Sequence, residues 1–268
     1  IMISFAVEGG SVGPHIDQYD VFLVQAMGQR NWQIENTQRH EPAFRPDADL
    51  KLLQEFNASH SWDLKPGDVL YLPPGYAHHG VALDACMTFS VGMRAPSSAE
   101  MLVDFAEDIA QALPEYVRYQ DPDLQICEDP YLIDEAALQR VDAALAAIQQ
   151  ASAEQRRRWF GQFITRYRAS GDVQAGPNHP SWSDALHQLG GGYALQRHPF
   201  ARLAWSHCDQ RALLHVSGES HAMSSIDAQW LCQNARIGSG NFHHLGKQAQ
   251  EVVAVLYSRG IYQTDTEE

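Results

Sequence analysis

The spacing of hydrophobic and polar positions changes along this chain and divides it into three parts. Up to about residue 96, short apolar or alternating runs are separated by Gly and Pro, a pattern typical of β-strands in an antiparallel barrel or jelly roll. Between residues 97 and 168, apolar positions recur every three or four residues, which predicts amphipathic helices. From residue 181 onward, short helical and strand-like runs alternate, and the stretch 169–180 before them has the Gly, Ser and Pro of a linker.

The first part contains several strand-like runs, and the last of them separates small from large side chains. Small residues take every second position of Cys86–Met93, and large apolar residues take the positions between them. Because alternate side chains of a strand point to opposite faces, we expect the small, polar face to line a ligand-holding lumen. Ser4 is likewise a polar exception in an apolar run. The expected strands are Ile1–Val7, Tyr19–Met27, Asn31–Glu35, Asp68–Leu72, Gly80–Leu83 and Cys86–Arg94.

The second part predicts three helices, over Glu100–Leu113, Asp134–Ala151 and Ser152–Arg168. Each carries an apolar stripe that must be buried against the barrel, another helix or a second subunit. Three such stripes exceed what one side of a small barrel would cover, so we expect this region to form a homodimer interface. We therefore expect Trp159 and Phe160 to be interface or core residues.

The third part, residues 181–268, has the size and the mixture of elements of a small winged-helix-like domain. Its acidic residues outnumber its basic ones, which argues against a DNA-binding face. His243 and His244 have no carboxylate at ligand spacing. No role is assigned to His198, His207, His215 or His221.

Composition narrows the choice of partners and compartment. The 268 residues carry a formal net charge of −14, so a basic partner is favoured over nucleic acid or an anionic membrane. The four cysteines (Cys86, Cys127, Cys208 and Cys232) are scattered, as in a reduced cytoplasmic protein. No apolar run has membrane-spanning length. Because Ile1–Val7 resembles the middle of a strand, we expect residues to precede it.

Two stretches of the first part offer metal ligands. In Gly13–Asp20, His15 and Asp17 lie two residues apart, so on an extended strand both point to one face. About sixty residues later, Pro73-Pro74-Gly75 precedes the pair His78-His79. Two histidines and one carboxylate on one face of a metal form the ligand set of non-haem Fe(II) oxygenases.

Only one histidine of the pair can face the same lumen as His15 and Asp17, because neighbouring strand residues point to opposite sides. We choose His78, three residues after Gly75. Any single histidine of this chain would more often be an ordinary core or surface residue. The combination of three candidate ligands with the Pro-Gly-Asp and Pro-Pro-Gly turns favours the metal site.

The segments GPHIDQYDVF, LKPGDVLYLPPGYAHHG and FSVGMRAP resemble those of JmjC-type 2-oxoglutarate oxygenases, and more narrowly those of bacterial ribosomal oxygenases. The resemblance covers nearly the whole chain. It implies a mainly β plus α architecture: a double-stranded β-helix (a jelly-roll, cupin-like JmjC barrel) over residues 1–96, a helical dimerisation region over 97–168, and a winged-helix-like α+β domain over 181–268.

The resemblance also implies the chemistry. Family members use Fe(II), the cosubstrate 2-oxoglutarate and O2, with His15, Asp17 and His78 in the positions of the catalytic metal ligands. The family places a basic residue thirteen positions after the aspartate to bind the distal 5-carboxylate, and that position is Arg30. A guanidinium can clamp a carboxylate with two parallel hydrogen bonds. Ser4 is the matching hydroxyl on the first strand, with Ser90 or Thr88 as weaker candidates on the last.

The implied function is dioxygenase hydroxylation of an arginine in a basic large-subunit ribosomal protein, without direct contact to nucleic acid or membrane. Other readings stay open. The enzyme could hydroxylate another residue or protein, since JmjC metal sites are nearly identical. A metal cupin isomerase or thiol dioxygenase would typically use a second histidine where this chain has Asp17. A binding scaffold without turnover would not need the three ligands and Arg30. Arg94 could close the barrel base or contact substrate.

Overall fold

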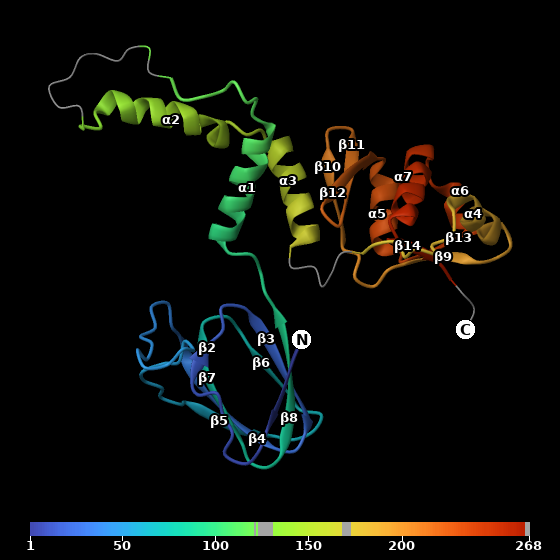
Figure 1. Cartoon of the computed structure of the whole chain (residues 1–268). Coiled ribbons are helices and arrows are strands. Elements are labelled where there is room, and N and C mark those ends of the chain that lie inside the picture. Colours follow the sequence, from blue (N-terminus) through green and yellow to red (C-terminus); the bar gives the residue numbers. More distant parts are fainter. Residues whose placement is uncertain (121, 123–130, 168–172, 266–268) are drawn as a thin grey trace. The chain divides into compact units, whose positions relative to one another are not determined.

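The structure is a computed structural model that describes residues 1–120, 122, 131–167 and 173–265. It divides the chain into two units, Ile1–Ser97 and Ser98–Glu268, which are described one at a time (Figure 1). Cys127, the end of the expected third helix at Arg168 and part of the expected linker 169–180 lie outside the described residues. No described helix is long and apolar enough to cross a membrane.

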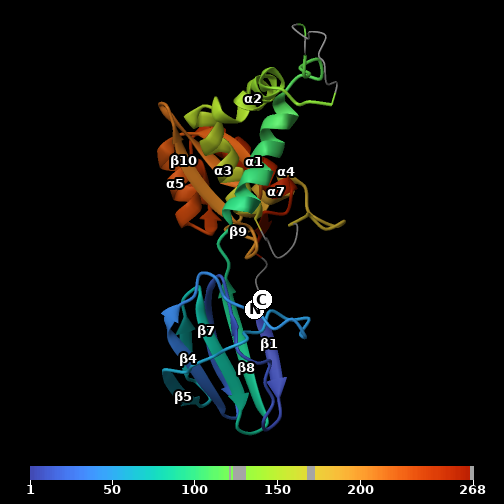
Figure 2. The ribbon, with the colours of Figure 1, turned by 90° about the vertical axis from the view of Figure 1, so that its left-hand side faces the viewer.

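The first unit is a barrel of two four-stranded antiparallel sheets, the double-stranded β-helix that the sequence predicts (Figure 2). In one sheet the order is β1 (Met2–Ala6), β8 (Cys86–Met93), β3 (Asp20–Met27) and β6 (Val69–Leu72). In the other it is β2 (His15–Ile16), β7 (Tyr76–Ala82), β4 (Arg30–Gln38) and β5 (His60–Leu64).

The two sheets bury a small apolar cluster formed by Val21, Leu23, Trp32, Ile34, Leu64 and Leu72. The alternation that predicts β3 and β8 is confirmed, since Val21 and Leu23 point inward and Cys86 and Thr88 are buried. Each strand places every second side chain inside, so the barrel interior is lined from both sheets.

The predicted strand at Gly80–Leu83 was too short, because the strand begins at Tyr76 and includes both neighbouring histidines. Strands β2 and β5 were not predicted. β5 is an edge strand in which four of five residues are exposed, so it shows no apolar alternation. A strand made mostly of exposed polar residues cannot be recognised from hydrophobic periodicity.

The second unit begins with three helices, α1 (Ser98–Ala112), α2 (Glu135–Gln149) and α3 (Ala153–Arg166). The side chain of Asp134 caps α2, and Ser152 with Gln155 forms a capping box at the start of α3. α1 and α3 pack through Phe105 and Trp159, whose rings lie 4.7 Å apart. The indole of Trp159 also donates a hydrogen bond to Asp104.

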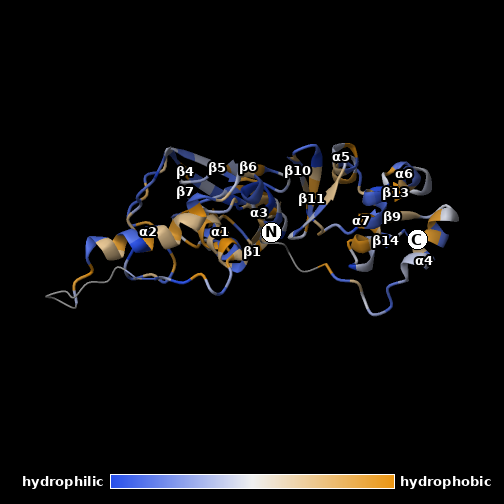
Figure 3. Cartoon of the chain, turned by 90° about the horizontal axis from the view of Figure 1, so that it is seen from above, coloured by the Kyte–Doolittle hydropathy of each residue, from blue (hydrophilic) through white to orange (hydrophobic). Residues whose placement is uncertain are grey.

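Helix α2 differs from its neighbours because it has no fully buried residue. Leu138, Val141 and Leu145 lie on one stripe and are each about half exposed. Figure 3 shows hydrophobic segments along α1 and α2. The apolar stripe predicted for this helix therefore exists, and the residues that the structure describes leave it about half exposed.

The rest of the second unit surrounds an apolar core built from helices and two three-stranded sheets, ordered β10-β11-β12 and β13-β9-β14. The elements are α4 (Trp182–Gly190), β9 (Ala194–Arg197), β10 (Leu203–Cys208), β11 (Arg211–Val216), β12 (Glu219–Met223), α5 (Ser225–Gln233), β13 (Arg236–Gly238), α6 (Ser239–His244), α7 (Lys247–Ser258) and β14 (Tyr262–Thr264). α3 packs on the β10-β11-β12 sheet. At the contact, a Cβ at Gly161 would lie 2.3 Å from the His215 ring, so only glycine permits this approach.

Candidate metal centre

The barrel brings His15, Asp17 and His78 together. His15 and His78 are direct partners in the antiparallel pairing of β2 with β7. Asp17 follows β2, and its carboxylate lies 3.7 Å from Nε2 of His78. One nitrogen or oxygen atom from each of the three side chains lies within 4.8 Å of the other two. That spacing can hold one metal ion between two imidazoles and a carboxylate.

Backbone carbonyls orient both imidazoles. Nδ1–H of His15 donates to the carbonyl of Gly13 at 2.9 Å, and Nδ1–H of His78 donates to the carbonyl of Tyr76 at 3.1 Å. A carbonyl oxygen only accepts, so the proton lies on Nδ1 of a neutral ring and Nε2 keeps its lone pair. Metal-ligating histidines commonly have such a partner on the other ring nitrogen.

Burial favours the ligating form of His78. Desolvation, followed by the neighbouring His15, lowers the pKa of His78 from 6.5 to about 4. The imidazole is therefore neutral at physiological pH, as metal ligation requires. Next to the site, burial and then the Asp17 carboxylate raise the pKa of the Tyr19 hydroxyl.

The neighbouring histidine does not join the three. Nε2 of His79 lies 2.9 Å from the hydroxyl of Ser11, and its ring meets Phe56 edge-on at 5.9 Å. The turn before the pair is tied to the other ligand strand, since the amide of Gly75 donates to the carbonyl of Asp17 at 2.8 Å. Gly75 has φ +83°, which glycine adopts without strain.

Arg30 lies inside the barrel with 6% of its surface exposed. One terminal nitrogen donates to the carbonyl of Gly80 at 3.2 Å, and the guanidinium carbon lies 4.8 Å from the centre of the Trp32 ring. Its Nε–H is buried without a hydrogen-bond partner. Burial lowers the pKa of Arg30, but an arginine stays charged in proteins. The barrel therefore holds a cation without an anionic partner among the described residues, and a carboxylate would supply it.

The three side-chain hydroxyl groups that the sequence offers as contacts for 2-oxoglutarate have different surroundings in the structure. The hydroxyl of Ser4 donates to the carbonyl of Thr88 at 3.3 Å, and that of Thr88 donates to the fully buried Gln25 at 2.9 Å. Ser90 is half-buried opposite Leu23. The sequence analysis did not identify Gln25 as an interior residue. Gln25 lies on the same face of β3 as Val21 and Leu23, and this alternation could have indicated that it is buried.

The other candidates do not form a second centre. No further group of His, Cys, Asp and Glu with ligand spacing occurs in the part of the chain that the structure describes. The exposed Arg94 acts on Tyr19 electrostatically, where it opposes the rise in pKa. His215 is buried, with its ring nitrogens 2.9 and 2.8 Å from the hydroxyls of Ser206 and Ser220.

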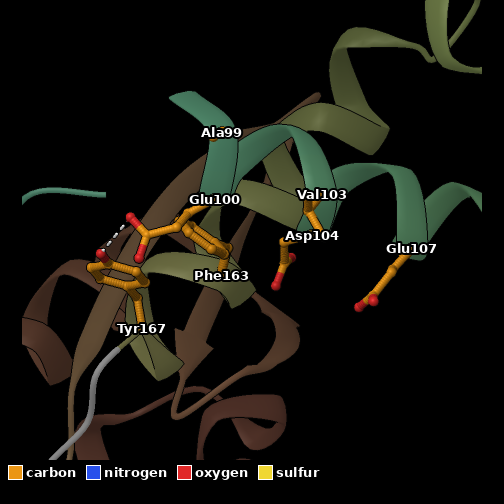
Figure 4. Close-up of a pocket in the computed structure, with 7 residues that line it drawn as sticks. All are labelled: Ala99, Glu100, Val103, Asp104, Glu107, Phe163 and Tyr167. Carbon is orange, nitrogen blue, oxygen red and sulfur yellow. Dashed lines mark hydrogen bonds between the residues drawn. The ribbon is translucent and has the colours of Figure 1, made fainter. Parts of the chain in front are cut away.

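A groove of about 480 Å³ lies between α1 and α3 in the second unit (Figure 4). Its aromatic lining is Phe163 and Tyr167, and the hydroxyl of Tyr167 donates to Glu100 at 3.0 Å. Asp104 on the same wall is paired with Arg166. The groove has acidic and aromatic groups, but its described lining residues form no ligand set for a metal.

Comparison with known proteins agrees with this geometry. Residues 1–101 match a JmjC domain, and residues 146–263 match a ROXA-like winged helix. The chain is 38% identical over 189 residues to the ribosomal protein uL16 3-hydroxylase of Escherichia coli, covering 70% of this chain and 49% of that protein. It is also 38% identical over 129 residues to a probable ribosomal oxygenase of Haemophilus influenzae, covering 48% of this chain and 30% of that protein.

Solved structures extend the similarity. The E. coli ribosomal oxygenase YcfD in complex with cobalt and 2-oxoglutarate aligns over 98% of this chain and 69% of its own, with a TM-score of 0.70 and 28% identity. The chain spans about half the length of the uL16 3-hydroxylase. With a JmjC barrel followed by a ROXA-like winged helix, this chain belongs to the JmjC-type ribosomal oxygenases.

Proposed function

We propose that this protein is an Fe(II)- and 2-oxoglutarate-dependent dioxygenase that hydroxylates a ribosomal protein. The observation that supports it best is the cluster of His15, Asp17 and His78 in the same barrel as Arg30, a buried cation without an anionic partner among the described residues. A metal with three protein ligands on one face keeps positions for a chelating cosubstrate and O2. A buried cation provides the counter-charge for a second carboxylate. YcfD, which shares this fold, has been solved with cobalt and 2-oxoglutarate.

The residues fit the metal and the cosubstrate. His15 and His78 would hold the ion through Nε2, because Nδ1 of each ring already donates to a backbone carbonyl, and Asp17 would hold it through a carboxylate oxygen. Arg30 would bind the 5-carboxylate of 2-oxoglutarate, and Ser4 or Ser90 would add a hydroxyl donor. Bound iron supplies the redox chemistry by which 2-oxoglutarate, O2 and a substrate C–H group give succinate, CO2 and a C–OH group.

The choice of substrate rests on similarity and charge. One relative is named for hydroxylation of ribosomal protein uL16. Ribosomal proteins are basic because they neutralise RNA phosphates, and a net charge of −14 favours their approach. We take the modified side chain to be an arginine.

The proposal also includes an oligomeric state and a cellular compartment. The helical region 97–168 would join two copies through the exposed stripe of α2, with 1–96 as the catalytic barrel and 181–268 as the winged-helix-like part. The scattered thiols suit the cytoplasm, where ribosomal proteins are available. Cys86, Cys208 and Cys232 are free.

The proposal is tested by incubating the Fe(II)-loaded chain with 2-oxoglutarate and purified ribosomal proteins, and then measuring succinate and peptide masses. It predicts succinate formation together with an arginine-containing peptide heavier by one oxygen. Succinate with oxygen on another residue would replace the arginine assignment. A chain that binds metal but forms no succinate would instead support a cupin isomerase or a binding scaffold.

A further inference from the structure

Trp32 has an unusual environment for a core tryptophan. It lies on the inward face of β4, two residues after Arg30, and only 4% of its surface is exposed. Its indole Nε1–H is buried and has no hydrogen-bond partner. Because an indole nitrogen can only donate, this group needs an acceptor, and a buried donor without one destabilises the fold.

The indole lies between the two ends of the proposed site. Its ring centre is 4.8 Å from the guanidinium carbon of Arg30 and 6.0 Å from the centre of the His78 ring. Gly80, directly across on β7, makes room for both side chains. A Cβ there would lie 2.7 Å from Nε of Arg30 and 2.7 Å from the Trp32 ring.

Arg30 and Trp32 therefore share one unmet requirement. Each has a buried nitrogen donor without an acceptor, both side chains extend from the same face of one strand, and both pack against Gly80. The indole lies near both His78 and Arg30, the two groups that such a ligand would span. A dicarboxylate offers acceptors at both ends, so one molecule could satisfy both orphan donors.

We propose that Trp32 is a positioning residue of the dicarboxylate site, where its ring forms one wall and its N–H donates to a ligand carboxylate. This inference rests on the proposed function and adds a second donor beside Arg30. A purely structural role predicts instead that the ring matters only for packing, since Trp32 also belongs to the apolar cluster of the barrel.

The neighbouring strand supplies a matched control. Trp62 on β5 is the direct pairing partner of Trp32, but it is 44% exposed and stacks on His60. Trp32→Phe and Trp62→Phe make the same chemical change, a ring that keeps its apolar area but loses its N–H. Only the first removes a donor from the barrel interior.

The test uses the full chain loaded with redox-inert zinc and titrated with 2-oxoglutarate or succinate by calorimetry. Loss of a hydrogen bond to a charged group should weaken dicarboxylate binding roughly tenfold to a hundredfold in Trp32→Phe. Trp62→Phe should bind within about twofold of the wild type. Wild-type affinity in a folded Trp32→Phe protein would overturn the proposal.

A measurement on the unmodified side chain covers the case in which Trp32→Phe fails to fold. The chain has six tryptophans, and their indole N–H resonances can be assigned by single substitution to Phe, with Trp32 recognised by elimination if necessary. Succinate should move the Trp32 signal downfield, as a new hydrogen bond requires, and leave Trp62 in place. An unmoved Trp32 signal in a protein that binds succinate overturns the inference and leaves the proposed function standing. A wild type that binds no dicarboxylate overturns both.

Discussion

The barrel and the second unit differ in the kind of buried polar group that they leave unpaired. Inside the barrel, Arg30 and Trp32 each leave a donor nitrogen unpaired, and one of these groups is a cation. In the second unit, the most deeply buried histidine, His215, has a serine hydroxyl at each ring nitrogen. Among the residues described for this unit, the unpaired buried atoms belong to neutral groups, namely the side chains of Gln188, His221, Tyr257 and Tyr262.

The apolar clusters of the two units also differ in size. The barrel's cluster has six buried residues, whereas the main cluster of the second unit has eighteen. A domain that fills its interior with packed side chains gains stability, whereas one that buries a cation without a counter-charge loses some stability at a functional site. The contrast indicates that the barrel interior is arranged for a ligand and the second unit for packing.

The largest expected effect follows from removing a metal ligand. Asp17→Ala takes away the only carboxylate of the cluster, so iron binding and succinate formation should both fall to background. Metal analysis of the purified protein and a succinate assay measure the two results. Retention of iron at wild-type stoichiometry would show that the ion is held elsewhere.

The two neighbouring histidines provide an internal comparison. His78→Ala should abolish turnover, while His79→Ala should keep most of it, because His79 contacts Ser11 and Phe56 and not the cluster. The reverse result would mean that the strand register around the site differs from that described here.

Replacing the buried cation should separate cosubstrate binding from metal binding. Arg30→Ala leaves the 5-carboxylate without its partner, a loss of roughly 2–5 kcal/mol by analogy with truncated buried charge pairs. The apparent affinity for 2-oxoglutarate should fall accordingly, whereas iron binding should persist. Arg30→Lys is the matched variant, and it should recover part of the affinity by restoring the charge without the planar fork. An unchanged 2-oxoglutarate dependence in Arg30→Ala would place the anchor elsewhere.

The predicted dimer interface of the second unit can be tested on helix α2. Leu145→Asp places a charge on the exposed stripe of α2, and in a dimer this charge would be buried at a cost of about 2 kcal/mol or more. Light scattering should show dimers for the wild type and monomers for the variant at micromolar concentration. Glu135→Gln, at the start of the same helix, is a control that should stay dimeric. A monomeric wild type would contradict the dimer.

A smaller effect should appear in the stability of the second unit. Burial, followed by Arg158 and His221, lowers the pKa of His215 from 6.5 to about 4. As the pH falls from about 6.5 to about 4, the unfolded chain takes up a proton that the folded chain resists, so the free energy of unfolding decreases. Urea titrations should show a loss that is smaller in His215→Gln than in the wild type, by on the order of 2 kcal/mol, because other histidines with a lowered pKa, such as His221, still contribute. His207→Gln, at an exposed position, should behave like the wild type.

The barrel was predictable from sequence because its strands alternate and its ligands lie in short, distinctive segments. His15 and Asp17 sit two residues apart, so local geometry places them on one face, and strand alternation separated His78 from His79. The edge strand β5 was not predictable, since its exposed residues show no alternation. The unpaired N–H of Trp32 could not be foreseen either. It depends on Gly80 and Arg30, which only the folded barrel brings beside it.

The proposed function requires that the barrel of this chain use O2 to hydroxylate a protein. The most direct measurement is to run the reaction under isotopically heavy dioxygen in ordinary water and to analyse both products by mass spectrometry. The account predicts one heavy oxygen atom in the hydroxylated peptide and one in succinate, with both labels absent in Asp17→Ala. Oxygen derived from water in the peptide, or succinate formed without any modified peptide from ribosomal proteins, would contradict it.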